Sequence, residues 1–270
     1  MTTSRTLMAF ERIQGIMARL RSPEGCLWDR RQTMADLGGY LMDEACEVLD
    51  AIDEGSPDHL KEELGDLFFQ IIFIARIAEE EGAFDMADVM VGIGDKMIRR
   101  HPHVFDSLKA DTVSAIRENW EAIKRREGRG RGDRESFFES VPRSLPPLRR
   151  ALKITDKAAR VGFDWSDRDG VIDTIREELD ELGASLSDRD ARGIEEELGD
   201  LLFSLVNLCR HARVDPDRAL RGSIRKFEDR FSFIVDRLAR ENKTPETATM
   251  DDMERLWKLS KENGILGDIP

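Results

Sequence analysis

The sequence lacks the features of a disulfide-bonded, secreted or membrane-spanning protein. It has three cysteines, Cys26, Cys46 and Cys209, and they form no CxxC pair. We therefore expect reduced thiols in a cytoplasmic protein rather than a disulfide framework. The sequence contains no apolar leader segment and no stretch of about 18 uncharged apolar residues, so neither secretion nor a membrane span is expected.

Aromatic residues are also scarce, and the 42 basic residues are outnumbered by 55 acidic ones. Aromatics make up 7% of the chain, with a single tyrosine, whereas charged residues make up 36%. This composition suits amphipathic helices better than twisted sheets, so we expect an all-α fold. The net charge of −13 argues against a positive face, and neither nucleic acid nor a membrane is expected as a partner. An anionic substrate would therefore need a bound cation between it and the acidic protein.

Four acidic residues occur twice with the same spacing. The first set is Glu44, Glu47, Glu63 and Asp66, and the second set is Glu178, Glu181, Glu197 and Asp200. Each member of the second set lies 134 residues after its counterpart, which indicates a duplicated module. A chain of 270 residues is long enough for two such domains, each with its own core. We expect domains at 1–126 and 148–270, joined by a linker at 127–147.

Glycines and prolines divide the sequence into predicted helices. The helices expected are 6–21, 34–54, 57–81, 86–100 and 111–126 in the first half, and 148–159, 168–186, 189–213, 216–240 and 250–262 in the second. The linker is rich in glycine and arginine and then in proline, so we expect a solvated connector. The arginines of 127–134 leave open a nucleic-acid-binding tail, although acids are interleaved with them and no aromatic residue accompanies them.

The spacing of the carboxylates predicts two metal sites. Glu44 and Glu47 lie one turn apart on one helix, and Glu63 and Asp66 do so on the next. Because a short connection makes these helices antiparallel neighbours, the four carboxylates would enclose a pocket. They would repel one another unless a cation neutralised them, and all-oxygen ligation selects Mg²⁺ first and Mn²⁺ second. For each motif taken alone, an exposed helix face that forms ion pairs is the alternative.

The helix expected at 57–81 is apolar around nearly its whole circumference after Glu63. We therefore expect a central, buried helix with Asp66 in the core. An unpaired carboxylate there is costly or takes up a proton, so it would need a cation or hydrogen-bond donors. Gly65 and Gly199, which precede the two aspartates, either permit close approach of a helix or phosphate or are packing glycines.

Two pairs of basic residues are repeated as well. Lys96 and Arg100 form a KxxxR unit, and Lys226 and Arg230 form the same unit in the second half. Residues four apart share one face of a helix. These cations are expected to bind phosphate oxygens that the metals leave uncovered, and ordinary ion pairs with neighbouring acids are the alternative.

With these residues assembled, the chain resembles the MazG family of nucleoside triphosphate pyrophosphohydrolases over nearly its full length. The family motif, EExxE followed by ExxD, is present as 43–47 with 63–66 and as 177–181 with 197–200, and further similar segments are 28–29, 32–33, 99–105, 161–165 and 226–228. Asp43 departs from the first Glu of the motif, and Leu27 stands where the family has proline. Gln70 is matched by Ser204 in the second copy. The second copy, with its intact EExxE, is therefore the one to test first.

The resemblance implies two tandem all-α, four-helix-bundle-like MazG domains in a homodimer that buries broad helical faces between its subunits. It implies Mg²⁺-dependent cleavage of (deoxy)nucleoside triphosphates between the α- and β-phosphates, with broad base specificity in nucleotide-pool housekeeping. The metal-binding and catalytic residues implied are Glu178, Glu181, Glu197, Asp200, Glu44 and Glu47, and Glu63 and Asp66 complete the first metal set. The substrate-binding residues implied are Lys226, Arg230, Trp257, Lys96 and Arg100. One glutamate would be the general base, and spacing does not identify it.

Two other classes of protein use similar helices. A di-iron oxidase also pairs carboxylates, but it requires Glu-x-x-His on two helices, and no ExxH occurs in the chain. A non-catalytic helical nucleotide-binding or interaction protein is the other alternative. The aspartate expected in the core of each repeat argues against it, because an adaptor has no evident use for a buried carboxylate.

Overall fold

The computed structural model describes residues 2–106, 111–128 and 137–264. All regular structure in these residues is helical, so the predicted all-α fold is confirmed. The chain divides into two compact units, residues 1–131 and 132–269, which are described separately below. No described helix combines the length and the apolar character needed to cross a membrane.

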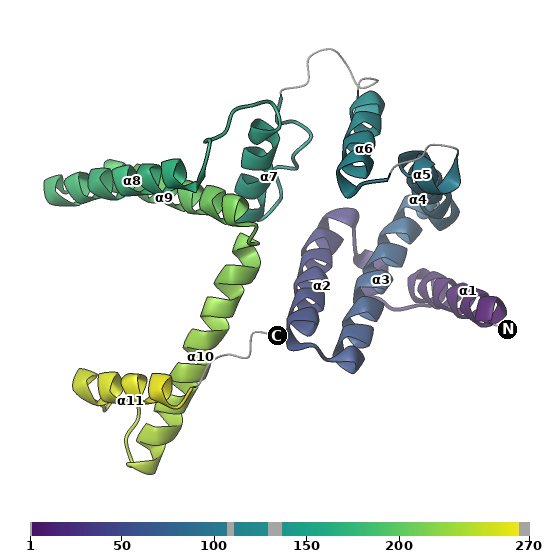
Figure 1. The fold of residues 1–270 in the computed structure, drawn as a ribbon. Helices are drawn as coiled ribbons and strands as arrows, with labels where there is room; N and C mark the ends of the chain where they lie inside the picture. Colours follow the sequence, from purple (N-terminus) through teal and green to yellow (C-terminus); the bar gives the residue numbers. More distant parts are fainter. Residues whose placement is uncertain (1, 107–110, 129–136, 265–270) are drawn as a thin grey trace. The chain divides into compact units, whose positions relative to one another are not determined.

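The first unit contains the five predicted helices, with α1 starting four residues early, and a short helix, α5, that was not predicted. Its helices are α1 (Thr2–Arg21), α2 (Met34–Glu54), α3 (Pro57–Glu80), α4 (Met86–Arg100), α5 (Pro102–Phe105) and α6 (Val113–Gly128), with a 3₁₀ turn at Asp29–Arg31. Thr33 caps α2 in a capping box with Asp36, and Gly55 ends it with a φ of 69°. α3 follows at once, with Ser56 as its N-cap and a proline in its first position. The α2/α3 pair is therefore a tight antiparallel hairpin (Figure 1).

The second unit repeats the hairpin. Its helices are α7 (Pro147–Ala159), α8 (Arg168–Asp188), α9 (Ala191–Ala212), α10 (Pro216–Arg240) and α11 (Met250–Glu262). α8 extends two residues past its predicted end, and the turn to α9 consists of Arg189, with a φ of 56°, and Asp190, which caps α9. α8 packs along α9, while α10 packs against α11 and α7. Thr249 and Asp252 form a capping box at the start of α11, and Lys243 donates to Asp252 at 2.8 Å.

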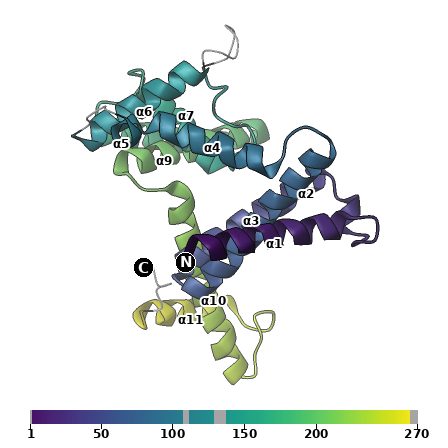
Figure 2. The same ribbon diagram turned by 90° about the vertical axis from the view of Figure 1, so that its right-hand side faces the viewer.

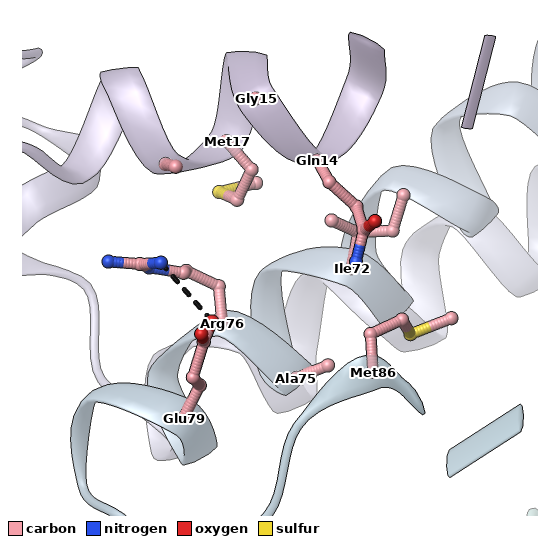
Figure 3. Close-up of a pocket in the computed structure, with 9 residues that line it drawn as sticks. Gln14, Gly15, Met17, Ile72, Ala75, Arg76, Glu79 and Met86 are labelled. Atoms are coloured by element: carbon pink, nitrogen blue, oxygen red, sulfur yellow. Dashed lines mark hydrogen bonds and ion pairs between the residues drawn. The ribbon is translucent and has the colours of Figure 1, made fainter. Parts of the chain in front are cut away.

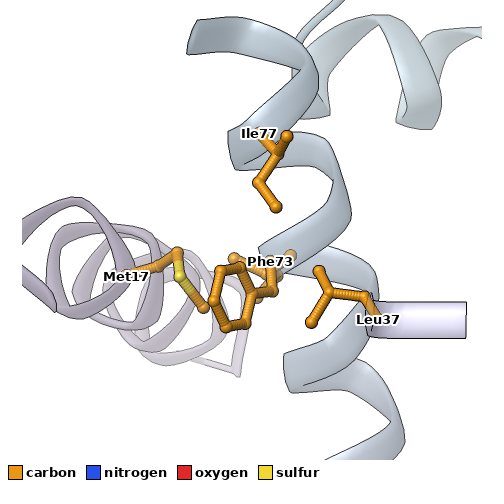
Figure 4. Packing of buried hydrophobic residues seen from close by; sticks show 5 residues of the cluster. Met17, Leu37, Phe73 and Ile77 are labelled. Carbon is orange, nitrogen blue, oxygen red and sulfur yellow. The ribbon is translucent and has the colours of Figure 1, made fainter. Parts of the chain in front are cut away.

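The core of the first unit lies where α1 and α2 meet α3. Met17, Leu37, Ile72, Phe73 and Ile77 form one buried cluster, and the side chains from all three helices converge in Figure 4. Burial of each such side chain contributes about 1.5–3 kcal/mol. In Figure 2, α1 crosses in front of α3, the helix that it packs against. α1 therefore packs on one side of the α2/α3 hairpin, which carries the carboxylates.

In the second unit, a cluster of buried residues smaller than that of the first unit lies between α10 and α11. Ile234, Leu238 and Leu256 are buried between α10 and α11, and Trp257 packs against them from the edge. This contact sets the position of α11 on α10. The packing of α11 on α10 therefore also positions the ring of Trp257.

α3 is not the central, buried helix that its sequence predicted. Leu64, Phe68 and Ile71 are 48%, 39% and 38% exposed, and Asp66 is exposed as well. The predicted core position of Asp66 is therefore wrong, and within the first carboxylate set it is Glu63, at 9%, that is buried. The physical reason is that α1, α2 and α4 cover only part of the apolar circumference of α3. In the second unit Asp200 is likewise exposed.

The segment predicted as a linker has three parts. Glu127 and Gly128 finish α6, and residues 129–136 lie outside the described residues. Residues 137–146 form turns beside α7, where Lys157 donates to Ser140 Oγ at 2.7 Å and lies over the ring of Phe137. The last part of the predicted connector is therefore attached to the second unit.

Arg21 ties the end of α1 to the end of α3. Its guanidinium donates to Glu80 Oε2 at 2.7 and 2.9 Å and to the carbonyl oxygens of Asp29 and Gln32, and it lies over the ring of Phe73. The hydrogen bonds from Arg21 hold the pKa of Glu80 below its usual value. The Arg21 side chain is 9% exposed, so these contacts are weakly screened by water.

We expect Arg21→Ala to lower the free energy of unfolding of the first unit by about 2–3 kcal/mol, because hydrogen bonds to charged groups contribute about 1.5–3 kcal/mol each. Arg19→Ala is the matched control, since Arg19 pairs with Glu24 in full contact with solvent and should cost about 0.5 kcal/mol or less. Urea denaturation followed by circular dichroism measures both. Equal losses in the two variants would contradict the anchoring role of Arg21.

Candidate metal centres

The α2/α3 hairpin brings three carboxylates together. Oxygen atoms of Glu44, Glu63 and Asp66 all lie within 4.8 Å of one another. Glu44 comes from α2, and the other two come from α3, one turn apart. Glu47, the fourth member of the predicted set, is exposed and outside this group, but it is near enough to raise the pKa of Glu44. The first predicted set is thus gathered at one place, with Glu47 at its edge.

The α8/α9 hairpin repeats this arrangement. Oxygen atoms of Glu178, Glu197 and Asp200 lie within 4.8 Å of one another. Glu181 is again outside the group of three and again contributes to the repulsion, here by raising the pKa of Glu197. The duplication seen in the sequence is therefore a duplication of geometry.

The clustered carboxylates destabilise one another's charged forms. Desolvation, followed by repulsion from Asp200 and Glu181, raises the pKa of Glu178. Desolvation, followed by repulsion from Glu181 and Glu178, raises the pKa of Glu197. In the first unit desolvation also raises the pKa of Glu44, against a hydrogen bond from Gln70. A positive charge at either cluster would relieve this cost.

The residues present fit a divalent cation. Buried polar atoms normally have a hydrogen-bond partner, yet the buried Glu63 Oε2 atom has none in the described structure. The converging donors at each cluster are all carboxylate oxygens, which suit hard divalent cations. Glu44, Glu63 and Asp66 could hold one ion, and Glu178, Glu197 and Asp200 could hold another.

The predicted substrate-binding residues of the second unit lie on α10 and α11. Arg230 lies over the ring of Trp257, with its Cζ atom 5.6 Å from the ring centroid. Lys226 precedes Arg230 by one helical turn and is half-buried. Since α10 packs against α11 and α7, whereas the carboxylates lie on α8 and α9, a role for these residues at the metal cluster stays a prediction.

The corresponding residues of the first unit lie on α4. Arg100 pairs with Glu127 on α6 and lies over the ring of Trp120. This is the ordinary ion pair that was the alternative to phosphate binding. Lys96 is half-buried one turn before Arg100.

Comparison with known proteins places these features in a family. The family model described as "MazG nucleotide pyrophosphohydrolase domain" matches residues 32–105 and 168–232, the regions of the two hairpins. The chain belongs to the MazG family. Both predicted domains therefore contain a MazG match, and the resemblance seen in the sequence is confirmed.

Two bacterial members of the MazG family match almost the whole chain. A Thermotoga maritima protein named nucleoside triphosphate pyrophosphohydrolase/pyrophosphatase MazG is 43% identical over 252 residues, which are 93% of this chain and 95% of that protein. An Escherichia coli K12 protein named nucleoside triphosphate pyrophosphohydrolase is 43% identical over 258 residues, 94% and 98% of the two chains. An uncharacterized Bacillus subtilis protein is 40% identical over 94% of this chain, which spans about half its length.

The two MazG clusters differ in their immediate surroundings. In the first, His59 Nε2 lies 3.1 Å from Glu63 Oε1, and Gln70 donates to Glu44 Oε1 at 3.2 Å. Gly193 and Ser204 occupy the corresponding places in the second. His59 also bonds Glu54, a contact that raises the pKa of the imidazole. The sequence pattern did not single out His59, although its position four residues before Glu63 on one helix was a signal.

A separate cavity in the first MazG unit has no part in the carboxylate cluster. It has a volume of about 280 Å³ and lies between α1, α3 and the start of α4. Met17, Ile72 and Met86 form apolar walls, and Arg76, paired with Glu79, lies at its edge (Figure 3). None of the clustered carboxylates lines this cavity.

We expect Glu197→Gln to raise the melting temperature of the metal-free protein at pH 7, because it removes one of the mutually repelling charges. The raised pKa means that folded Glu197 binds a proton more tightly than the unfolded chain does. As the pH falls through the range just above ordinary carboxyl pKa values, the native residue becomes neutral by itself, and the advantage of Glu197→Gln should disappear.

Thermal melts with chelator present, between pH 7 and pH 5, measure this difference. Glu195→Gln is the matched control, since Glu195 is an exposed glutamate of the same helix outside the cluster. A lower melting temperature for metal-free Glu197→Gln than for Glu195→Gln would contradict the repulsion.

Proposed function

We propose that the protein is a Mg²⁺-dependent nucleoside triphosphate pyrophosphohydrolase. It cleaves (deoxy)nucleoside triphosphates between the α- and β-phosphates and releases a monophosphate and pyrophosphate. The observation that carries the proposal is the converging carboxylate cluster of a MazG domain, present in each unit. Support also comes from the printed names of two relatives that match almost the whole chain.

The proposed chemistry divides between the metal and the side chains. When bound, Mg²⁺ supplies charge neutralisation for the triphosphate and lowers the pKa of an attacking water. Glu178, Glu197 and Asp200 would hold it, with Glu181 at the edge of the set. One of the glutamates of the set would double as the general base that accepts a proton from the water.

Residues of α10 and α11 would bind the rest of the nucleotide. Lys226 and Arg230 would contact phosphate oxygens, for which a guanidinium is well suited. The ring of Trp257 would stack on the base. Stacking requires only the flat face that every base has, so this contact favours broad base specificity and a role in nucleotide-pool housekeeping.

The second cluster is proposed as the main catalytic site. In the first cluster two carboxylates already have partners within the chain, Glu63 with His59 and Glu44 with Gln70. A metal there would compete with these contacts. At the second cluster, a glycine and a serine stand in their places.

The exposed apolar surfaces support a homodimer. Leu64, Phe68 and Ile71 on α3 are exposed, as are Leu198 and Leu202 on α9. Contiguous apolar faces of this kind mark interaction sites. A second copy of the chain, with the same faces, would cover them in a symmetric interface.

We expect the purified protein with Mg²⁺ to release pyrophosphate, and not orthophosphate, from several nucleoside triphosphates. Glu178→Gln should lower this activity more than about 100-fold, because even residues that only support metal ligands change metal affinity about 10–100-fold. Glu44→Gln is the matched substitution in the first cluster and should cost much less. A coupled pyrophosphate assay measures all three proteins.

Absence of pyrophosphate with every canonical nucleoside triphosphate would reject the enzyme and leave the non-catalytic nucleotide-binding alternative. Equal losses in Glu178→Gln and Glu44→Gln would reject the proposed difference between the two clusters while leaving the activity in place.

For the dimer, we expect Leu202→Glu and Phe68→Glu to shift the particle mass toward that of one chain, because each places a charge in the proposed interface. Val113→Glu is the control, since Val113 is an exposed apolar residue on α6, outside these faces. Light scattering coupled to size exclusion measures the masses. A wild-type particle with the mass of a single chain would contradict the proposed homodimer.

A further inference from the structure

His59 places a nitrogen donor at the edge of the first carboxylate cluster. On α3, His59, Glu63 and Asp66 follow one another at intervals of four and three residues, so they share one face of the helix. Nε2 of His59 lies 3.1 Å from Oε1 of Glu63. His59 is not one of the three residues whose oxygens converge within 4.8 Å, and it adjoins that group through Glu63. The carboxylate motif does not include this imidazole.

A carboxylate on the other side of the ring orients the imidazole. Oε2 of Glu54, the last residue of α2, lies 2.7 Å from Nδ1 of His59. An ionised carboxylate only accepts hydrogen bonds, so Nδ1 carries the proton in this contact. In a neutral imidazole the lone pair is then on Nε2, on the side of Glu63. Metal-binding histidines typically donate their other ring N–H to a carboxylate in this way.

The separation between His59 and Glu63 suits two ligands of one ion. Zinc ligands lie about 2.0–2.2 Å from the metal, so two of them at angles between a right angle and the tetrahedral angle are about 2.8–3.6 Å apart. The observed 3.1 Å falls in this range. The second oxygen of Glu63, Oε2, is buried and has no hydrogen-bond partner among the described residues. A cation beside this side chain would satisfy a buried carboxylate that is otherwise incompletely paired.

We propose that the first cluster is a binding site for a zinc-like divalent ion, with Nε2 of His59 as a ligand beside carboxylate oxygens of Glu63, Asp66 and Glu44. One nitrogen and three oxygens make up the four ligands that zinc usually takes. The carboxylate oxygens, within 4.8 Å of one another, need only side-chain adjustments to surround one ion. The imidazole is 36% exposed, so an ion can reach it from solvent.

The two clusters would then select different ions. Imidazole nitrogen suits Zn²⁺, whereas Mg²⁺ prefers oxygen ligands and retains several waters. At the first cluster Mg²⁺ would have to compete with the contact between His59 and Glu63, but a zinc-like ion would use both of these atoms as ligands. Gly193 stands at the place of His59 in the second cluster and supplies no side-chain nitrogen. The inference does not rest on the proposed hydrolysis.

The test is a titration of the chelator-treated full chain with Zn²⁺, in competition with a chromophoric zinc chelator and in excess Mg²⁺. We expect wild type to hold its tightest zinc ion at least about tenfold more tightly than His59→Ala does, because even residues that only orient metal ligands change affinity about 10–100-fold. His59→Gln keeps a polar side chain at this place and should lose a similar factor. His103→Ala is the matched control, since it removes a histidine of α5 outside the cluster, and it should bind zinc as wild type does.

Co²⁺ is a spectroscopic probe of the same site. Four-coordinate Co²⁺ absorbs visible light much more strongly than Co²⁺ surrounded by six oxygens. We expect the strong band in wild type and in His103→Ala, and its loss in His59→Ala and His59→Gln. A structural role of His59 would not change this spectrum.

The alternative role for His59 predicts the opposite sign. A doubly protonated imidazole would form ion pairs with both Glu54 and Glu63. Such a cation repels a metal ion, so its removal would strengthen metal binding. Unchanged or tighter zinc binding in His59→Ala would therefore overturn the inference, and so would an equal loss in His103→Ala. Zinc binding requires no release of pyrophosphate, so a failure of the proposed activity would leave this test unaffected.

Discussion

Repulsion among carboxylates held close together is the constraint on which the rest of the structure depends. Each hairpin places three acidic oxygens within 4.8 Å of one another in partly desolvated surroundings. Such an arrangement is costly unless positive charge or hydrogen-bond donors compensate it. The two units compensate differently, since the first has His59 and Gln70 beside its cluster, and the second has a glycine and a serine. The two hairpins therefore differ in the groups that neighbour their carboxylates.

Much of this arrangement could be predicted from the sequence because it is local. α2 and α4 begin and end at the predicted residues, since Thr33 and Gly55 bound the first and Asp85 caps the second. The gathering of the carboxylates followed from helical spacing and short connections, which fix the faces of two adjacent helices. Capping and periodicity act within a few residues, so no knowledge of distant contacts was needed.

The features that sequence reasoning missed depend on contacts between distant segments. The apolar circumference of α3 suggested a buried Asp66, but periodicity identifies apolar residues without showing which neighbours cover them. The pairing of Arg100 with Glu127 joins residues 27 positions apart. The anchor from Arg21 to Glu80 joins residues 59 apart. The sequence alone does not show which of the many acidic residues pairs with Arg100 or with Arg21.

The cap of α11 and the second carboxylate cluster are expected to respond differently to acid. Lys243, followed by Thr249, lowers the pKa of Asp252 to about 2, so this carboxylate keeps its charge when the solution becomes mildly acidic. The raised pKa values of Glu178 and Glu197 mean that their cluster takes up protons first. Mild acidity would thus protonate Glu178 and Glu197 before it affects the cap of α11. In the proposed function, base stacking on Trp257 and metal binding at the carboxylates are therefore expected to have separate pH profiles.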